Sequence, residues 1–352
     1  MAMKIRIGNK KYIGDGCPPF LIAEAGINHN GDIEKAYAMI SVAKEAGADA
    51  VKFQTFKAEE FIGDPEMVFT YKSQGKEVTE SMLEMFRRCE FGRDVWFLLK
   101  KRCDDESIMF LSTPQNRSDL DLLLEVGITA IKVGSDDFTN IPLLKSYAST
   151  GLPVIISCGM SDMAEVYQTL EAVGALDGHP TVLMLCTSEY PTPPEDVNLL
   201  KLRTLGNVFP DIVLGFSDHT QGPLASSLAA AMGAKVFEKH FTLDHNLPGP
   251  DHWFSEEPTK LKEWVSYIRT SRTMLGDAIV RPTVKEKEMI KLARRCIVAS
   301  SNISVDEILS SDNIGLKRVR GGLSSLYYEN LIGLKAARNI EKNSIIRWGD
   351  FK

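Results

Sequence analysis

The chain has 352 residues, 44% of them hydrophobic and 25% charged, which is typical of a soluble globular protein and gives room for two domains or one large barrel with an appendage. This composition excludes a disordered chain, a collagen-like chain and a disulfide scaffold. The net charge of −6 argues against nucleic acid as a partner, and no run approaches the ~18 apolar residues of a membrane span.

The N-terminal residues and the cysteines indicate the compartment. Residues 1–12 alternate charged and apolar side chains and lack the apolar core of a signal peptide. The six cysteines form no Cys-x-x-Cys pair, which argues against a zinc ribbon or a thioredoxin-type site. Cys158 and Cys186 lie in apolar runs and are expected to be small buried residues. We therefore expect a cytoplasmic protein with no membrane partner.

Eight short apolar runs recur along the body of the chain, each of strand length and near turn or capping residues. They cover residues 20–23, 50–53, 108–111, 130–133, 154–156, 182–186, 212–216 and 235–238. Helical patterns lie between them, such as a stripe that follows the candidate N-cap Asp32 and stripes that stop at Gly127 and Gly233. Eight strand–helix units over about 260 residues predict an α/β protein with a (β/α)8 TIM barrel. A doubly wound open sheet is the alternative, but its Gly-x-Gly-x-x-Gly fingerprint is absent.

One connection is unusually long. Residues 63–95 are too many for a simple loop after the second strand, and they carry Tyr71, Met82, Met85 and Phe86 among many charges. We interpret this stretch as an extended, partly helical connection. A functional loop and a helix packed on the outside of the barrel are both open interpretations.

The pattern changes after residue 275. The segment 276–282 resembles a linker, 285–292 a polar helix, and 296–300, 314–316 and 345–347 short strands. Residues 294–352 hold ten Lys/Arg and six Asp/Glu, a net charge of +4 that leaves −10 for the rest. A basic module on an acidic body suggests a domain that meets an anion or the body itself, although small modules also vary in charge by chance. We predict a barrel domain over 1–280, a linker over 281–293 and a small, mostly-β domain over 294–352.

Polar residues follow every predicted barrel strand, at the end where barrels of this type carry their chemistry. In chain order they are Glu24; Lys52 and Gln54; Ser112 and Thr113; Lys132 and Ser135; Ser157; Ser188, Glu189 and Tyr190; Ser217, Asp218, His219 and Thr220; and Glu238, Lys239 and His240. Capping alone accounts for single cases and poorly for all eight. Two lysines and several hydroxyls at one mouth suit a phosphate or carboxylate.

Two histidines come from neighbouring strands of this predicted barrel. His219 follows the seventh strand and His240 ends the eighth, so both are candidates to hold one divalent metal ion. The alternative is that each histidine is a hydrogen-bonded structural residue, which is the commoner case for a lone histidine at a barrel rim.

Several runs together resemble the sialic acid synthase family, and the tail resembles that family's C-terminal antifreeze-like (SAF) domain. The runs are Ile22-Ala23-Glu24-Ala25-Gly26-Ile27-Asn28-His29-Asn30-Gly31, Lys52-Phe53-Gln54, Gly215-Phe216-Ser217-Asp218-His219-Thr220, Glu238-Lys239-His240-Phe241-Thr242-Leu243-Asp244 and Gly249-Pro250-Asp251-His252. The resemblance covers nearly the whole chain. It implies condensation of phosphoenolpyruvate with an open-chain N-acyl hexosamine of the N-acetylmannosamine type, giving N-acetylneuraminate or a close analogue and phosphate.

The resemblance also implies roles for individual residues. Phosphoenolpyruvate would be held by Lys52, Thr113, Lys132, Ser135, Ser157, Ser188 and Ser217. The sugar would meet Gln54, Asp137, Tyr190, Asp251 and, from the partner chain of a homodimer with exchanged tails, Arg318. Glu24 would be the acid/base residue, and His219 and His240 would bind Mn²⁺ or Mg²⁺.

Elementary chemistry agrees with these implied roles. Phosphoenolpyruvate is a polyanion, so its site needs cations and oriented donors. Its C3 is a weak nucleophile, so the aldehyde must be polarised, which a metal ion can do. Attack leaves positive charge at C2 beside the Glu24 carboxylate, and Glu24 is then placed to take the proton of the water that adds there.

The sugar is left open by three departures from the family pattern. Ser188 replaces the usual asparagine or threonine, Asp137 is one methylene shorter than the glutamate common in bacterial members, and Gln115-Asn116 follows Ser-Thr-Pro. N-acetylmannosamine, its 6-phosphate and the diacetylated 6-deoxy sugar that leads to legionaminic acid all remain candidates.

Two other functions are compatible with parts of the chain. A Schiff-base aldolase would use Lys132, but a lysine among serines is expected to be an anion ligand and not a desolvated amine of lowered pKa. An ice-binding surface on the tail would need a flat, weakly charged face, whereas Lys317, Arg318 and Arg320 lie close together.

Overall fold

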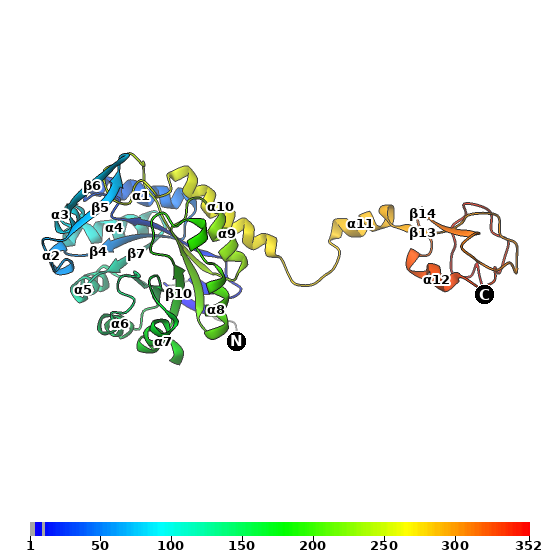
Figure 1. Ribbon diagram of the computed structural model, residues 1–352, viewed down its shortest axis with the longest axis horizontal. Coiled ribbons are helices and arrows are strands. Elements are labelled where there is room, and N and C mark those ends of the chain that lie inside the picture. The colour runs from blue at the N-terminus through cyan, green and yellow to red at the C-terminus, as the bar shows by residue number, and fades with distance from the viewer. Residues whose placement is uncertain (1–3, 9–10) are drawn as a thin grey trace. The chain divides into compact units, whose positions relative to one another are not determined.

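The computed structural model describes residues 4–8 and 11–352 and divides at residue 276 into two compact units, Met1–Gly276 and Asp277–Lys352. A ring of parallel strands surrounded by helices forms the first unit (Figure 1). None of the described helices is long and apolar enough to cross a membrane.

The eight predicted barrel strands all form. They are β3 (Phe20–Gly26), β4 (Ala50–Thr55), β7 (Met109–Pro114), β8 (Ile131–Val133), β9 (Val154–Ser157), β10 (Thr181–Cys186), β11 (Val213–Asp218) and β12 (Val236–His240). They pair in parallel in the order β7-β4-β3-β12-β11-β10-β9-β8. This confirms the (β/α)8 barrel and not the doubly wound sheet, since β12 at the end of the series pairs with β3 at its start.

Helices cover the outer face of the ring. They are α1 (Ile33–Ala46), α4 (Arg93–Asp105), α5 (Arg117–Val126), α6 (Ile141–Ala148), α7 (Met163–Ala172), α8 (Leu200–Val208), α9 (Leu224–Ala231) and α10 (Pro258–Leu275). The short 3-10 turns η1 (Ala175–Asp177) and η2 (Pro194–Asp196) lie in the connections. Local residues set the bounds of these helices: Asp32 accepts hydrogen bonds from two N–H groups at the start of α1, and Gly127 ends α5 in the left-handed conformation.

A hairpin closes the lower end of the barrel, which is the end where the strands begin. Strands β1 (Lys4–Ile7) and β2 (Lys11–Gly14) pair in antiparallel register, and their buried Ile5, Ile7 and Ile13 pack with apolar side chains from the starts of the barrel strands. Burial of this apolar surface seals the lower end, so the polar strand ends at the other side are left to form an open site.

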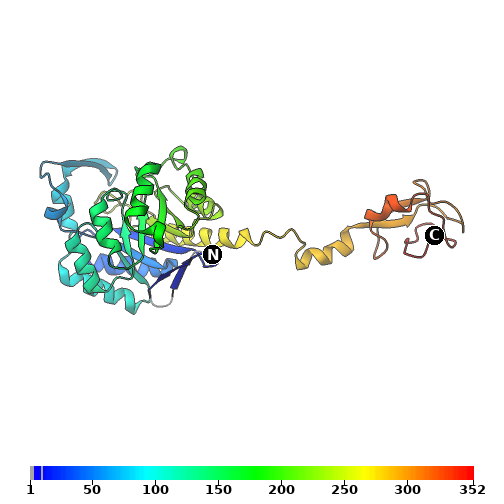
Figure 2. The ribbon, with the colours of Figure 1, turned by 90° about the horizontal axis from the view of Figure 1, so that it is seen from below.

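The long connection after β4 contains more than the part-helical segment we predicted. It runs through α2 (Ala58–Phe61), an antiparallel hairpin of β5 (Val68–Ser73) and β6 (Lys76–Ser81), and α3 (Met82–Cys89). The hairpin stands out at the edge of the barrel (Figure 2). Its side chains are mostly exposed, so no alternation between buried and exposed positions marked it as a pair of strands.

Gly31 shows how closely this connection packs on the barrel. Its φ is +70°, and a Cβ at this position would lie 2.3 Å from the carbonyl oxygen of Arg88, at the end of α3. Only glycine permits both the left-handed backbone and this approach. The turn that follows β3 is thereby held against α3.

The second unit has a small core of its own. Helix α11 (Val284–Ala293), which begins with a capping box at Thr283, leads into the antiparallel strands β13 (Arg295–Ala299) and β14 (Ile314–Arg318), then η3 (Ser325–Tyr327) and α12 (Tyr328–Leu331). The core includes Ile297, Leu309 and Ile346. A third strand predicted at 345–347 is wrong: this segment makes one isolated bridge, between Ile345 and Val298, because the chain is otherwise wound into turns.

Candidate active site

A cavity of about 1160 Å³ lies at the C-terminal ends of the barrel strands. It is lined by thirteen of the fifteen residues to which the family resemblance gave a role: Glu24, Lys52, Gln54, Thr113, Lys132, Ser135, Ser157, Ser188, Tyr190, Ser217, His219, His240 and Asp251. The period of two along a strand explains part of this convergence. Lys52 and Gln54 face the barrel interior, whereas Phe53 between them packs outward against Trp96 and Phe110.

Two lysines and two glutamates form the floor of the cavity. Glu238 lies between the lysines, with its carboxylate 3.7 Å from Lys52 Nζ and 3.5 Å from Lys132 Nζ. Lys52 Nζ also lies 2.9 Å from Glu24 Oε2. All four side chains are buried. The two buried ammonium groups are thus paired with carboxylates, and an anion would reach them only if these pairs rearranged.

Hydroxyl groups complete the floor. Lys52 Nζ donates to Thr113 Oγ1 at 3.0 Å, and Lys132 Nζ donates to Ser157 Oγ at 2.8 Å. Ser135 Oγ accepts from the backbone N–H of Gly159 at 2.9 Å, and Ser217 donates to Glu238 at 3.1 Å. Each of these oxygens is therefore held in place from a different strand end, as a preorganised site requires.

The charge state of Glu24 suits proton transfer near neutral pH. Burial and, to a smaller extent, the neighbouring Glu238 raise its pKa to about 7, against the lowering effect of Lys52. For Glu238 the opposite holds: burial alone would raise its pKa, but Lys132 and Lys52 outweigh burial and lower it to about 2. Two carboxyls in one cavity thus differ in proton affinity because each faces a different set of cations.

Lys132 is a desolvated amine, contrary to the prediction from the sequence. Its side chain is 2% exposed, and burial lowers its pKa despite the attraction of Glu238. The prediction that Lys132 is not a desolvated amine is therefore wrong, because this lysine is buried although it lies at a strand end. The Lys132 ammonium instead sits below the rim, bonded to Ser157 and to the carbonyl oxygen of Val133.

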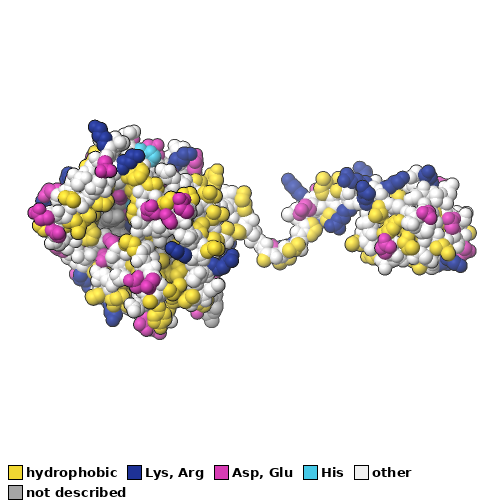
Figure 3. All heavy atoms as spheres, in the orientation of Figure 1, with side chains coloured by type: hydrophobic (Ala, Val, Ile, Leu, Met, Phe, Trp, Pro, Cys, Tyr) yellow, Lys and Arg dark blue, Asp and Glu magenta, His cyan; other side chains and the backbone are white. Residues whose placement is uncertain are grey.

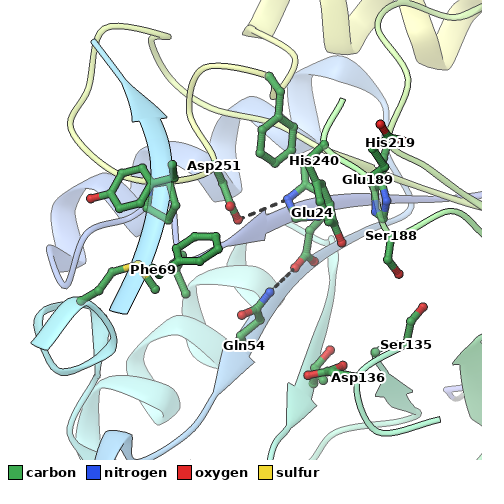
Figure 4. A pocket seen from close by; sticks show the side chains of 18 of the residues that line it. Glu24, Gln54, Phe69, Ser135, Asp136, Ser188, Glu189, His219, His240 and Asp251 are labelled. Atoms are coloured by element: carbon green, nitrogen blue, oxygen red, sulfur yellow. Dashed lines mark hydrogen bonds and ion pairs between the residues drawn. The ribbon is translucent and has the colours of Figure 1, made fainter. Parts of the chain in front are cut away.

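The two histidines lie on one side of the cavity, with ring centroids 5.4 Å apart. His219 Nδ1 lies 2.8 Å from the carbonyl oxygen of Thr187. When Nδ1 carries the proton and donates it in a hydrogen bond to this carbonyl, Nε2 keeps a free electron pair. Burial lowers the pKa of His240 well below its usual value, and its Nδ1 is buried with no hydrogen-bond partner. Asp251 Oδ2 lies 3.6 Å from this nitrogen, as Figure 4 shows.

These histidines fit a divalent metal ion. Burial favours the neutral form of His240, and a neutral imidazole with an unpartnered buried nitrogen is the form that ligates metals. At His219 burial alone would lower the pKa, but Cys186 and the Thr187 carbonyl outweigh burial and raise it, so a metal ion there would compete with a proton. Within residues 4–8 and 11–352, no cluster of three or more His, Cys, Asp or Glu side chains could hold a metal ion. The pair can therefore hold one only if water or substrate oxygen atoms complete the coordination shell.

One predicted sugar contact does not lie on the cavity wall, and another belongs to the second unit. Asp137 is absent from the wall and accepts a hydrogen bond from Asn140 at 2.9 Å, whereas its neighbour Asp136 lines the cavity (Figure 4). Arg318 lies at the end of β14 in the second unit, where its side chain is exposed.

Sequence reasoning missed several residues of the wall. Glu238 had been noted only as a strand-end residue, and no role was assigned to Asp136 or Phe254. The connection after β4 adds apolar side chains from α2, the hairpin and α3 to the cavity wall: Phe61, Phe69, Met82, Met85 and Phe86. The unusual length of this connection was the sequence feature that could have indicated these wall residues. These apolar side chains can contact the less polar part of a substrate.

The fold and the site together define a class: a (β/α)8-barrel protein whose strand ends bring together two buried lysines, two buried glutamates and two histidines. Comparison with known proteins is more specific. The family pattern of NeuB matches residues 39–280, and that of the SAF domain matches residues 294–352. The chain belongs to the NeuB family.

The similarity to known relatives extends over nearly the full chain. N,N'-diacetyllegionaminic acid synthase of Legionella pneumophila is 36% identical and covers 99% of each chain. N-acetylneuraminate-9-phosphate synthase of Homo sapiens is 33% identical over 98% of this chain and 96% of its own. The crystal structure of N-acetylneuraminic acid (sialic acid) synthetase from Leptospira borgpetersenii, in complex with citrate, is 35% identical, with a TM-score of 0.73 over 82% of this chain and 96% of that one.

Proposed function

We propose that the protein condenses phosphoenolpyruvate with the open-chain form of an N-acyl amino sugar, giving a nine-carbon 2-keto acid and inorganic phosphate. The observation that supports this most is the convergence of the lysine floor, Glu24 and both histidines in one cavity of a NeuB-family barrel. The relatives named above carry the names of sialic and legionaminic acid synthases.

Phosphoenolpyruvate would bind on the floor. Lys52 and Lys132 would release Glu24 and Glu238 in part to pair with its carboxylate and phosphate, and Thr113, Ser135, Ser157, Ser188 and Ser217 would donate to its oxygens. Charge-assisted hydrogen bonds from buried lysines are among the stronger polar contacts in proteins. Burial of the floor also keeps bulk water from the reacting carbons.

His219 and His240 would hold Mn²⁺ or Mg²⁺, and the bound ion would polarise the aldehyde of the sugar as a Lewis acid. Glu24 would stand beside C2 of phosphoenolpyruvate, stabilise the positive charge that develops there, and accept the proton of the water that adds. Its pKa of about 7 allows both the acceptance and the later return of a proton to the departing phosphate.

The sugar would extend from the histidines toward Gln54, Tyr190 and Asp251, with Asp137 as a predicted further contact. The candidates are N-acetylmannosamine, its 6-phosphate and the diacetylated 6-deoxy sugar. Phosphate release from phosphoenolpyruvate with each sugar, with and without metal ion, tests the function. Release that requires one of these sugars supports it, and the absence of sugar-dependent release with all three would refute it.

Lys132 should not form a Schiff base, although it is buried with a lowered pKa. A Schiff base needs a free electron pair on Nζ, which here donates to Ser157 and Val133 and faces Glu238. Borohydride reduction in the presence of pyruvate should leave the mass of the protein unchanged. A pyruvate adduct at Lys132 would favour the aldolase instead, and Lys235→Met is a control for reaction at other lysines.

We take residues 1–280 as the barrel domain, 281–293 as the linker and 294–352 as the tail, and infer a homodimer in which each tail serves the partner's barrel. Basic side chains gather along α11 and the adjoining part of the second unit (Figure 3). The tail carries +4 and the rest of the chain −10. Arg318, exposed at the end of β14, would then meet the N-acyl group of the sugar bound to the partner.

Subunit mixing tests the exchange of tails. Arg318→Ala removes one charged hydrogen bond and should lower kcat/KM for the sugar by about 10–100-fold while phosphoenolpyruvate binding is kept. Mixing these subunits with Glu24→Gln subunits should restore about a quarter of wild-type activity, because half of the dimers are mixed and each of those has one intact site. If verified mixed dimers stay as inactive as the parents, each tail serves its own barrel.

A further inference from the structure

A buried ionic network lies behind the two histidines, outside the cavity wall. Lys239 is 2% exposed, and its Nζ lies 3.2 Å from Asp218 Oδ2 and 3.6 Å from Glu256 Oε1. Asp218 is 1% exposed and Glu256 7%. None of the three side chains lines the cavity, so the reaction as proposed does not use them. Buried charges of this kind are costly unless they are paired and hydrogen-bonded, so each of these three groups needs such partners.

The network fixes the turn that carries His219. Asp218 Oδ1 accepts hydrogen bonds from the backbone N–H of Thr220 at 2.9 Å and from its hydroxyl at 2.8 Å, which makes His219 the middle residue of a side-chain-closed turn. Lys239 Nζ donates to the carbonyl oxygens of Thr220 and, at 3.1 Å, Gly222. The backbone on the C-terminal side of His219 is thus held by both members of the ion pair.

The same network also holds the strand end that carries His240. Lys239 is the residue before His240 in β12, and the backbone N–H of Glu256 donates to the carbonyl oxygen of His240 at 2.9 Å. The Glu256 carboxylate accepts from the N–H of Gly222 at 2.7 Å, in the loop after His219. Glu256 and Lys239 therefore link the two histidine-bearing segments to each other.

Two outer helices hold the network in place. Ser226 in α9 donates to Asp218 Oδ2 at 2.5 Å, and Trp264 in α10 donates through Nε1 to Ser226 Oγ at 2.8 Å. Both side chains are fully buried. The core packing of the barrel thereby sets where Asp218 lies. With one ammonium and two carboxylates, the network has a formal charge of −1, which favours a cation at the nearby histidines.

We propose that Lys239, with Asp218 and Glu256, is a positioning residue that sets the relative placement of the His219 and His240 imidazoles and thereby the affinity for the divalent metal ion. The inference depends on the proposed metal site. Outer partners that orient metal ligands typically change metal affinity by about 10–100-fold when removed. Because the pair supplies only two protein ligands, its affinity depends directly on how well the two rings are placed.

Equilibrium binding of Mn²⁺ to the full-length protein, followed by electron paramagnetic resonance of the free ion, tests this. Lys239→Met should weaken Mn²⁺ binding by about 10–100-fold. Phosphoenolpyruvate binding should be unchanged, since its lysines lie on other strands. The Mn²⁺ concentration for half-maximal activity should rise equally, with kcat recovered at saturating Mn²⁺. Lys235→Met is the matched control: it removes a lysine–carboxylate pair, with Asp15, just before the start of the same strand β12.

The outcomes are separable. If the wild-type protein does not bind Mn²⁺, the metal proposal fails and this inference with it. If wild type binds and Lys239→Met binds equally well, only the positioning role is refuted. An equal loss of Mn²⁺ and phosphoenolpyruvate affinity would also refute it, as general damage to the barrel. Should Lys239→Met not fold, Thr220→Val, which removes one hydrogen bond to Asp218, must weaken Mn²⁺ binding in the same direction, and unchanged affinity there refutes the proposal.

Discussion

Replacing Glu24 with glutamine is expected to lower kcat by about 10²–10⁴-fold, the usual contribution of a general base. The amide keeps the shape of the side chain but cannot accept a proton from the water that adds at C2. Phosphoenolpyruvate should bind at least as well as before, because Lys52, now 2.9 Å from the Glu24 carboxylate, loses a competing partner. Stopped-flow or steady-state phosphate release, together with direct binding of phosphoenolpyruvate, measures both effects.

The pH profile provides a second readout for the same residue. With a pKa of about 7 in the unliganded protein, Glu24 is protonated at lower pH and cannot act as a base. The kcat/KM of the wild-type protein should therefore fall as the pH decreases through about 7, and the residual activity of Glu24→Gln should lack this limb. Glu263→Gln, a surface carboxylate on α10, serves as the control for loss of charge. A variant that changes only KM would make Glu24 a binding residue.

Removal of divalent metal should abolish sugar-dependent phosphate release, with a loss of about 10²–10³-fold or more, because Lewis-acid polarisation contributes several kcal/mol. Addition of Mn²⁺ should restore activity. Restoration should be quick and should need excess ion, since the residues that the structure describes offer two histidines and no third ligand, and such a pair binds weakly. Full activity in the presence of chelator would contradict the metal role.

Single histidine variants localise the ion. His219→Ala and His240→Ala should each lose Mn²⁺ binding and resist reactivation, while His179→Ala, whose side chain lies outside the cavity wall, should behave as the wild type. Because His240 has a pKa well below its usual value, protonation of this ring should not limit metal binding at neutral pH. Reactivation of His240→Ala at ordinary Mn²⁺ concentrations would place the ion elsewhere.

Much of the fold follows from the sequence alone, because its signals are local. The eight apolar runs correspond to β3, β4 and β7 to β12. Asp32 caps the start of α1 and Gly127 the end of α5, as predicted. Convergence of the polar residues follows from one rule of barrel geometry, that parallel strands end on the same side. The β5–β6 hairpin was missed, since exposed strands carry no burial pattern.

The charge state of the site was decided by tertiary structure. Lys52, Lys132 and Glu238 come from β4, β8 and β12, and only the folded barrel brings both lysine Nζ atoms within 3.7 Å of the Glu238 carboxylate. Burial together with this pairing raises the pKa of Glu24, lowers that of Glu238 and desolvates Lys132, whereas the sequence had suggested a solvated lysine. Periodicity reports which face of a segment is buried; proton affinity depends on the distances to charges on other segments, and those distances exist only once the barrel has closed.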